Sequence, residues 1–248
     1  MRILMFAWEY PPHVVGGLGK HTAELLPALG ELPDLELHLV TPRWAGGQLM
    51  EAVGRATVHR VDPPITDGDF YTSAWQTNSR LEQYANRLWE ETGPFDLIHV
   101  HDWLVAFVGV AFKHNYGVPL VSTIHATERG RGRGLLGSDQ SRAIHHIEWW
   151  LTYESWRVIA CSNYMADEIS DYFHCPLDKI DVIPNGVDSE RFDQLEGEDL
   201  SHFRGMYALP SEQVIFSVGR VVFEKGLHVL IRATPLILGQ QPAAKIVI

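Results

Sequence analysis

The sequence has little cysteine and no long hydrophobic run. Its 248 residues include only two cysteines, Cys161 and Cys175, too few for a disulfide scaffold or a cysteine-rich zinc module. The longest apolar run, residues 104–112, is far shorter than the ~20 residues of a membrane-spanning helix. The first apolar run, residues 3–8, is too short for a signal peptide. These absences predict a cytoplasmic protein without a transmembrane segment.

Positive charge is also scarce. Lys and Arg number 20 against 31 Asp and Glu, for a formal net charge of −11. This balance argues against a nucleic-acid partner, because phosphate binding needs a basic face. Hydrophobic residues make up 46% and charged residues 21%, which argues against disorder and favours a chain that buries a sizeable core.

Short apolar runs alternate with amphipathic stretches along the chain. This alternation predicts an α/β fold: a Rossmann-like parallel sheet with helices on both faces. Ligands of such sheets bind beyond the carboxyl ends of the strands, so the residues that follow each strand are the first site candidates. The strands are expected at residues 2–8, 35–40, 56–61, 95–101, 119–125, 158–161 and 180–183, and the helices at 19–29, 76–91, 104–115, 139–155 and 164–172.

A second unit is expected near the C-terminus. A strand at residues 214–218, a helix at 227–238 and a strand at 245–248 form one further βαβ unit. We therefore expect a first domain over residues 1–195. Residues 196–248 are expected to hold a linker and the start of a second Rossmann-like domain, because one βαβ unit cannot bury both faces of its sheet.

Gly16, Gly17 and Gly19 lie between the first strand and the first helix. Glycines there let backbone N–H groups approach a ligand, and a helix N-terminus favours an anion. The P-loop pattern is excluded because His21 follows the glycine–lysine pair, and the dinucleotide pattern because Thr22 occupies its third-glycine position. A phosphate-cradling turn of another kind and a purely structural tight turn both remain open.

Two histidines end predicted strands. His101 shares one strand face with His99, and His125 ends the next strand. A neutral imidazole at either strand end can hydrogen-bond a sugar hydroxyl. The His99–His101 pair also resembles the strand-end metal pair of amidohydrolases, so a metal-dependent hydrolase is an alternative, but no further ligand set is visible and no metal is predicted. A packed core histidine is the other interpretation, above all for His99.

Basic residues gather at two glycine-containing loops. The first follows His125, and its alternation of arginine with glycine favours a loop that closes over an anionic or polyhydroxyl substrate. The second follows the predicted strand at residues 214–218, where an arginine fork and a lysine point charge suit a diphosphate. Solvated surface loops are the alternative for both. The residues concerned are Glu128, Arg129, Arg131 and Arg133 in the first loop, and Arg220 and Lys225 in the second.

Together these segments resemble GT-B glycosyltransferases, in particular glycosyltransferase family 4 and the related glycogen and starch synthases. Each motif is weak alone, whereas their order and spacing are specific. The resemblance covers the whole chain. It rests on Glu9-Tyr10-Pro11-Pro12, Gly16-Gly17-Leu18, His101-Asp102-Trp103, Thr123-Ile124-His125, Val182-Ile183-Pro184-Asn185-Gly186-Val187-Asp188, Val218-Gly219-Arg220 and Glu224-Lys225-Gly226.

The resemblance implies two Rossmann-like domains, an N-terminal one for the acceptor and a C-terminal one for a nucleotide-sugar. Transfer would retain anomeric configuration, with no metal and no cofactor beyond a UDP-, ADP- or GDP-linked donor. The acceptor would be a carbohydrate or another hydroxyl compound; the oligomeric state is left open. The implied roles are diphosphate contact for the backbone of Gly16 and Gly17, contact with the donor sugar or reacting centre for His101 and His125, and neutralisation of the leaving diphosphate for Arg220 and Lys225.

Two departures from the family pattern bear on function. Val14 stands where glycogen and starch synthases carry a lysine, which favours the broader family 4 over a polymer synthase. The donor domain of the family contains a Glu-x7-Glu segment that contacts sugar and ribose, and the sequence ends at residue 248, before the position of that segment in the family. We therefore expect the N-terminal portion of a longer enzyme, inactive by itself, with a non-catalytic carbohydrate-binding module as the alternative.

Overall fold

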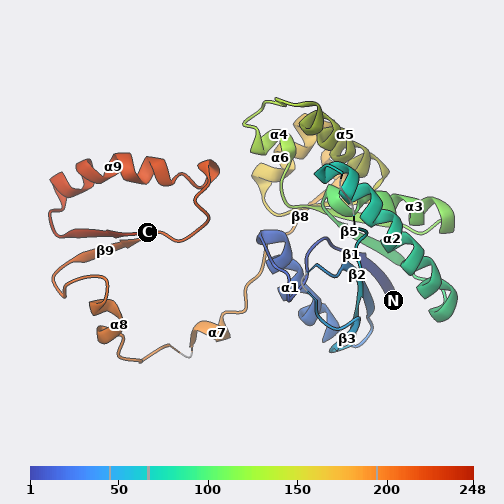
Figure 1. The fold of residues 1–248 in the computed structure, drawn as a ribbon, viewed down its shortest axis with the longest axis horizontal. Coiled ribbons are helices and arrows are strands. Elements are labelled where there is room, and N and C mark those ends of the chain that lie inside the picture. The colour runs from blue at the N-terminus through green and yellow to red at the C-terminus, as the bar shows by residue number, and fades with distance from the viewer. Residues whose placement is uncertain (45, 66–67, 194) are drawn as a thin grey trace. The chain divides into compact units, whose positions relative to one another are not determined.

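The computed structural model describes residues 1–44, 46–65, 68–193 and 195–248. Over these residues the chain divides into two compact units, Met1–Val187 and Asp188–Ile248, coloured from blue to red along the chain in Figure 1. Both units alternate strands with helices, so the predicted α/β class is confirmed. The first unit ends at Val187, ahead of the boundary predicted at residue 195.

Among the described residues of the first unit, eight strands form one sheet in the order β3-β4-β2-β1-β5-β6-β7-β8. The neighbouring strands are parallel except β3 and β4, which pair antiparallel. Every strand predicted for this unit is present, and β3 is additional. The bounds are β1 Arg2–Phe6, β2 Glu36–Pro42, β3 Met50–Val53, β4 Ala56–Val61, β5 Leu97–His101, β6 Leu120–Ile124, β7 Arg157–Ala160 and β8 Ile180–Val182.

A buried arginine anchors the additional strand. Arg60 on β4 is buried and donates to Glu51 Oε2 on β3 and to the carbonyl oxygen of Pro11, each at 2.6 Å. A buried charge is tolerated only when it is paired and hydrogen-bonded. Strand β3 has only four residues, the lower length limit for recognising strand alternation. Its pairing with Arg60 cannot be read from the sequence pattern, and for both reasons β3 was not predicted.

Helices cover both faces of this sheet (Figure 1). Alternation along β1 sends Leu4 and Phe6 into a core cluster with α2, α3, α5 and α6, and Ile3 and Met5 into a second cluster with Leu26 of α1. The helices are α1 Gly17–Gly30, α2 Phe70–Thr92, α3 Ala106–Tyr116, α4 Glu128–Arg131, α5 Asp139–Glu154 and α6 Asn163–Phe173, with 3₁₀ turns η1 Trp103–Val105 and η2 Leu177–Lys179.

Side-chain caps fix where several of these helices begin. Asp69 accepts the N–H of Thr72 at 2.7 Å, so α2 begins at Phe70 rather than at the predicted residue 76. Ser138 and Ser141 form a capping box at the start of α5. Ser162 accepts from the third residue of α6 in the same manner. Each satisfies an N–H group that the first helical turn leaves without a partner.

The second unit contains the predicted βαβ element. Strands β9 Gln213–Phe216 and β10 Ala244–Val247 pair in parallel and are connected through η3 Phe223–Lys225 and helix α9 Leu227–Gln240. Two short helices, α7 Glu190–Asp193 and α8 Ser201–Gly205, precede them. Phe203, Phe216 and Val218 line an apolar cavity and remain more than half exposed, as expected of a single βαβ unit.

Close packing at Gly109 on α3 sets the distance between this helix and the sheet. A methyl group added at Gly109 would overlap Val100 Cγ1 of β5 and come within 3.3 Å of Leu120 Cδ1 of β6. We expect Gly109→Ala to lower the free energy of unfolding by about 1–3 kcal/mol, because overpacking forces side chains or backbone to shift. A Val100→Ala change in the same chain is expected to recover part of the loss.

Gly137→Ala is the matched control, since a Cβ at Gly137 meets nothing within 4 Å. Its effect is expected to stay within about 0.5 kcal/mol. All 8 tryptophans lie within residues 1–187, so urea denaturation followed by tryptophan fluorescence reports the first unit alone. Equal stability of the two alanine variants would contradict the tight approach of α3.

Candidate functional site

Three histidines meet at the carboxyl ends of β5 and β6. His101 is the buried last residue of β5, His125 follows β6, and His21 lies on α1. His101 Nδ1 is 3.2 Å from His125 Nε2. The ring of His21 has its centroid 5.3 Å from that of His101 and 4.6 Å from that of His125. One nitrogen of each ring lies within 4.8 Å of the others, and we call these three residues the histidine cluster.

Parallel pairing brings the two predicted histidines together. Strands β5 and β6 pair with His101 opposite Thr123, so their carboxyl ends meet at one edge of the sheet. His99 lies outside the cluster: its Nε2 hydrogen-bonds Thr123 Oγ1 at 2.8 Å. The structure therefore brings His101 and His125 together. His99 is instead a hydrogen-bonded structural residue, in agreement with its interpretation as a packed core histidine.

Asp102 ties the two strand ends to each other. Its carboxylate accepts the backbone N–H of His125 at 2.7 Å, and its own N–H donates to the carbonyl oxygen of Thr123 at 2.9 Å. Asp102 has φ 61°, a left-handed conformation that is uncommon outside glycine. Burial raises the pKa of Asp102 to about 6, and the His125 N–H opposes that change. This residue fixes the backbone on which His125 is carried.

Neighbouring groups orient the outer rings of the cluster. Asn185 Oδ1 lies 2.8 Å from His21 Nδ1; because an amide oxygen only accepts, Nδ1 of His21 carries the proton and Nε2 has the lone pair. Cys161 Sγ lies 3.7 Å from His125 Nδ1. The Nε2 atoms of His21 and His101 are buried and have no hydrogen-bond partner within the part of the chain that the structure describes.

All three rings are neutral near pH 7. Burial lowers the pKa of His125 to about 4. Burial, followed by the neighbouring histidines, lowers the pKa of His101 well below its usual value. For His21, burial and His125 lower the pKa against the opposing hydrogen bond from Asn185. A neutral imidazole offers one N–H donor and one lone pair, which is the pairing that a hydroxyl group needs.

Glu9 occupies the glycine turn beside the cluster. Its Oε2 accepts the N–H groups of Val15 at 2.8 Å and Gly16 at 3.1 Å. A Cβ at Gly19 would lie 2.6 Å from the same oxygen, so this glycine makes room for the carboxylate. The N–H of Gly16 is thus committed inside the protein, whereas Gly17 begins α1, where the first N–H groups have no intrahelical acceptor.

The arginine–glycine segment that follows His125 contains a helical turn. Residues Glu128–Arg131 form the helical turn α4, capped by Thr127. Arg129 lies over the ring of Tyr172 at 4.7 Å and donates to the carbonyl oxygen of Gly134. Arg131 pairs with Glu128 at 3.4 Å across an exposed turn, and Arg133 adopts φ 52°.

Glu148 on α5 is a buried acid that the motifs did not indicate. It is 1% exposed and accepts the N–H of Glu128 with both oxygens, at 2.8 and 3.0 Å. Burial raises the pKa of Glu148 to about 8, and the Glu128 N–H and the charge of Arg131 offset only part of that change. Glu148 therefore holds the start of α4 in place, on the loop that follows His125.

The predicted diphosphate-binding residues belong to the second unit. Arg220 follows β9 and Lys225 closes η3, and both side chains are exposed. Each thus comes after a strand end, as the sequence pattern predicts. Gly226, between η3 and α9, has a φ of +70°, a conformation that glycine adopts more readily than other residues.

Sequence reasoning assigned no site role to His21, Asn185 or Glu148. The search for site residues was limited to the positions that follow strands, so it did not include His21, a helix residue whose side chain points toward the strand ends. Helical spacing is the signal that was available: His21 lies four residues after Gly17, one turn into α1, on the side of the turn that faces the strand ends. Nothing in the sequence indicates that Asn185, 164 residues away, meets its ring.

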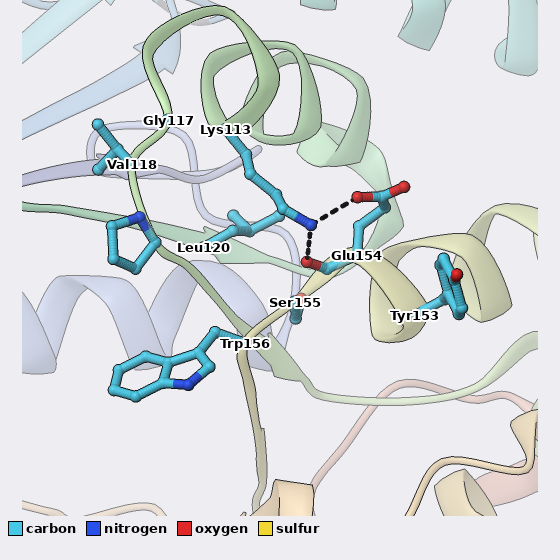
Figure 2. A pocket seen from close by; sticks show the side chains of 9 residues that line it. Lys113, Gly117, Val118, Leu120, Tyr153, Glu154, Ser155 and Trp156 are labelled. Atoms are coloured by element: carbon cyan, nitrogen blue, oxygen red, sulfur yellow. Dashed lines mark hydrogen bonds and ion pairs between the residues drawn. The ribbon is translucent and has the colours of Figure 1, made fainter.

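A separate cavity of about 490 Å³ lies at the opposite end of the sheet, by the amino end of β6 (Figure 2). Lys113 of α3 crosses it and donates to the carbonyl oxygen and the carboxylate of Glu154, each at 2.7 Å. Tyr153 and Trp156 border it. Because β6 separates this cavity from His125, it is no part of the histidine cluster.

Comparison with known proteins gives a consistent class. Residues 15–191 match the family described as Glycosyltransferase Family 4. An uncharacterized glycosyltransferase of Methanocaldococcus jannaschii is 38% identical over 250 residues, covering 100% of this chain and 62% of that protein. Glycogen synthase of Mycobacterium tuberculosis is 35% identical over 265 residues, covering 100% of this chain and 61% of that protein.

A solved structure agrees at the level of the fold. The catalytic domain of starch synthase IV from Arabidopsis thaliana, bound to ADP and acarbose, matches with a TM-score of 0.72 at 19% identity, over 98% of this chain and 67% of that one. The fold is that of the GT-B class. The chain belongs to glycosyltransferase family 4. It spans somewhat less than two thirds of the two relatives, and no helix of its described residues is long and apolar enough to cross a membrane.

The pKa of Glu148 makes the stability of the first unit depend on pH. Its folded-state value of about 8 exceeds the ordinary 4.5, so between these values the folded chain keeps a proton that the unfolded chain has lost. The group's contribution is therefore full below pH 4.5 and declines as pH rises toward 8. We expect Glu148→Gln, which keeps an oxygen acceptor without the charge, to exceed wild type by up to a few kcal/mol near pH 8 and to match it near pH 5.

Glu154 on the same helix is the matched control of opposite sign. Burial acts to raise its pKa, but the hydrogen bond and charge of Lys113 outweigh burial and the pKa ends below its usual value. Glu154→Gln is expected to cost stability at neutral pH, with a deficit that shrinks as the pH falls. Urea denaturation across this pH range measures both variants, and a Glu148→Gln curve parallel to wild type would be the contrary result.

Proposed function

We propose that the gene product is a retaining, metal-independent glycosyltransferase that transfers a sugar from a nucleotide-sugar to a carbohydrate or other hydroxyl acceptor. The observation that carries this proposal is the histidine cluster. Neutral rings with unpartnered buried nitrogens gather at the carboxyl edge of a parallel sheet, where α/β folds bind their ligands. Unpaired buried nitrogens cost free energy, and a bound sugar hydroxyl would satisfy them.

Sugar recognition by neutral imidazoles follows from their chemistry. A hydroxyl both donates and accepts, and each ring offers the complementary lone pair and N–H. We assign His101 and His125 to the donor sugar and the reacting centre. His21 joins them, with Asn185 holding its Nδ1–H and leaving Nε2 for the substrate. The buried carboxylate of Asp102 serves this site through the backbone of His125.

Charge on the leaving group is the second requirement of the proposed reaction. As the glycosidic bond to the donor breaks, negative charge grows on the diphosphate, and preorganised positive groups lower that barrier. We assign this role to Arg220 and Lys225 and to the first N–H groups of α1 from Gly17 onward. Gly16 contributes by shaping the turn, because its N–H is bound to Glu9.

The remaining assignments concern the residues that contact the acceptor and the nucleotide of the donor. The residues of α4 and the following turn, Glu128, Arg129, Arg131 and Arg133, adjoin the loop after His125, and we assign them to the acceptor. The structure of starch synthase IV contains ADP and acarbose, a nucleoside diphosphate and an oligosaccharide. We extend that ligand chemistry to this chain, with UDP, ADP and GDP all open as the nucleotide.

The sugar-transfer assignment is tested at His125. We expect His125→Ala in the full gene product to lower kcat/KM roughly 10²- to 10³-fold, the loss typical of removing one transition-state donor. His146→Ala is the matched control, an exposed histidine on α5 that stacks on Trp149 and should leave turnover unchanged. A panel of UDP-, ADP- and GDP-sugars measures both variants with EDTA present. Equal rates for the two variants, or loss of wild-type turnover in EDTA, would argue against the assignment.

The 248-residue chain by itself is expected to give no turnover with any nucleotide-sugar, since it spans only about 62% of the length of its relatives. Product formation by the purified chain, assayed beside the full gene product, would refute this expectation. Acceptor binding without turnover by the gene product would instead identify a carbohydrate-binding module.

A further inference from the structure

We propose that the histidine cluster, His21, His101 and His125, is a binding site for a soft divalent cation, with Zn²⁺ as the best fit. The ion would bind one nitrogen of each ring and keep a fourth position for water. Metal binding is independent of the proposed function. Its consequence for sugar transfer, inhibition by occupying the nitrogens assigned to the sugar, rests on that function.

The spacing of the rings fits tetrahedral zinc. Two nitrogens that bind Zn²⁺ at about 2.0–2.1 Å stand roughly 3.4 Å apart. His101 Nδ1 and His125 Nε2 lie 3.2 Å apart, and all three ligand nitrogens lie within 4.8 Å of one another. His21 and His125 are only half-buried, so their rings have room to rotate toward the roughly 3.4 Å separation that zinc requires.

The surroundings already provide what metal-bound histidines need. Such a ring usually donates its second N–H to a fixed oxygen, which sets the tautomer and the ring orientation. Asn185 Oδ1 accepts from His21 Nδ1 at 2.8 Å, leaving the unpartnered Nε2 of His21 for the ion. For one ion to bind all three rings, each ligand nitrogen presents its lone pair and the proton of each ring lies on the opposite nitrogen.

The ligand atoms select the class of cation. Mg²⁺ and Ca²⁺ require oxygen ligands, and the cluster offers three nitrogens. Asp102, next to His101 in the chain, has a carboxylate oxygen engaged by the His125 N–H. Imidazole suits Zn²⁺, Cu²⁺ and Ni²⁺. Three histidines with one open position match the arrangement that zinc adopts where it binds an exchangeable water.

The competing arrangement is a set of hydrogen-bonded histidines without an ion. A separation of 3.2 Å between His101 and His125 is also an ordinary N–H···N distance. That arrangement leaves the buried Nε2 of His21 unpartnered, whereas the cation satisfies it. The two arrangements differ in a measurable respect, because only one predicts stoichiometric metal uptake that depends on His21.

Titration of the 248-residue chain with Zn²⁺ by calorimetry, and with Co²⁺ by visible absorption, tests the proposal. We expect one ion per chain and a tetrahedral Co²⁺ spectrum. His21→Ala should weaken Zn²⁺ binding at least 100-fold, and Asn185→Ala by 10- to 100-fold, as the loss of a partner oxygen does. His146→Ala is the matched control, since His146 is an exposed histidine outside the three-nitrogen group, and it should bind as wild type does.

Tryptophan fluorescence of each variant confirms that the first unit is folded before binding is compared. Absence of stoichiometric binding to the folded wild-type chain would overturn the proposal. So would binding that survives His21→Ala or disappears in His146→Ala. In the full gene product, added Zn²⁺ should inhibit turnover and EDTA should restore it. Zn²⁺ bound at the cluster without inhibition would contradict the sugar assignment while leaving the metal site intact, so the two failures are distinguishable.

Discussion

The hydrogen bond from the His125 backbone N–H to the Asp102 carboxylate, 2.7 Å long, is the contact on which the candidate site depends. It joins the carboxyl ends of β5 and β6 just where each strand delivers a histidine. Parallel strands leave their last backbone groups without ladder partners, and a buried N–H must be paired. Asp102 supplies the partner from a strained backbone position, a local cost that the pairing of two strand ends offsets.

Acidic side chains hold this part of an acidic protein together by accepting backbone N–H groups. Asp102 binds the backbone of His125, Glu148 binds that of Glu128, and Glu9 binds the glycine turn. Each fixes a loop that leaves the carboxyl edge of the sheet. The arginines nearby are engaged with their own neighbours, as Arg129 is with Tyr172. The edge is therefore shaped by hydrogen-bonded acidic side chains, and the neutral rings of the histidine cluster lie among them.

Much of the fold could be predicted from the sequence, because apolar runs and their alternation determine which segments become strands. His101 and His125 could be predicted as site residues for the same reason, since strand ends are visible in the pattern. Strand β3 could not, because its place depends on the pairing of Arg60 with Glu51, which apolar alternation does not reveal. The contact between His21 and Asn185 could not be predicted from any local pattern either. It joins residues 164 positions apart and forms only after β1, α1 and β8 have assembled.

The chemistry of the histidine cluster explains why one site can suit both a sugar and a metal ion. A sugar hydroxyl and Zn²⁺ each take the lone pair of a neutral imidazole, and burial keeps all three rings neutral. The hydroxyl can also accept from an N–H, whereas the cation cannot. A ring that must donate to substrate therefore favours the sugar, and a ring whose N–H is already bound elsewhere, as His21 is to Asn185, favours the ion. The balance between the two ligands is thus set by the outer partners of the rings.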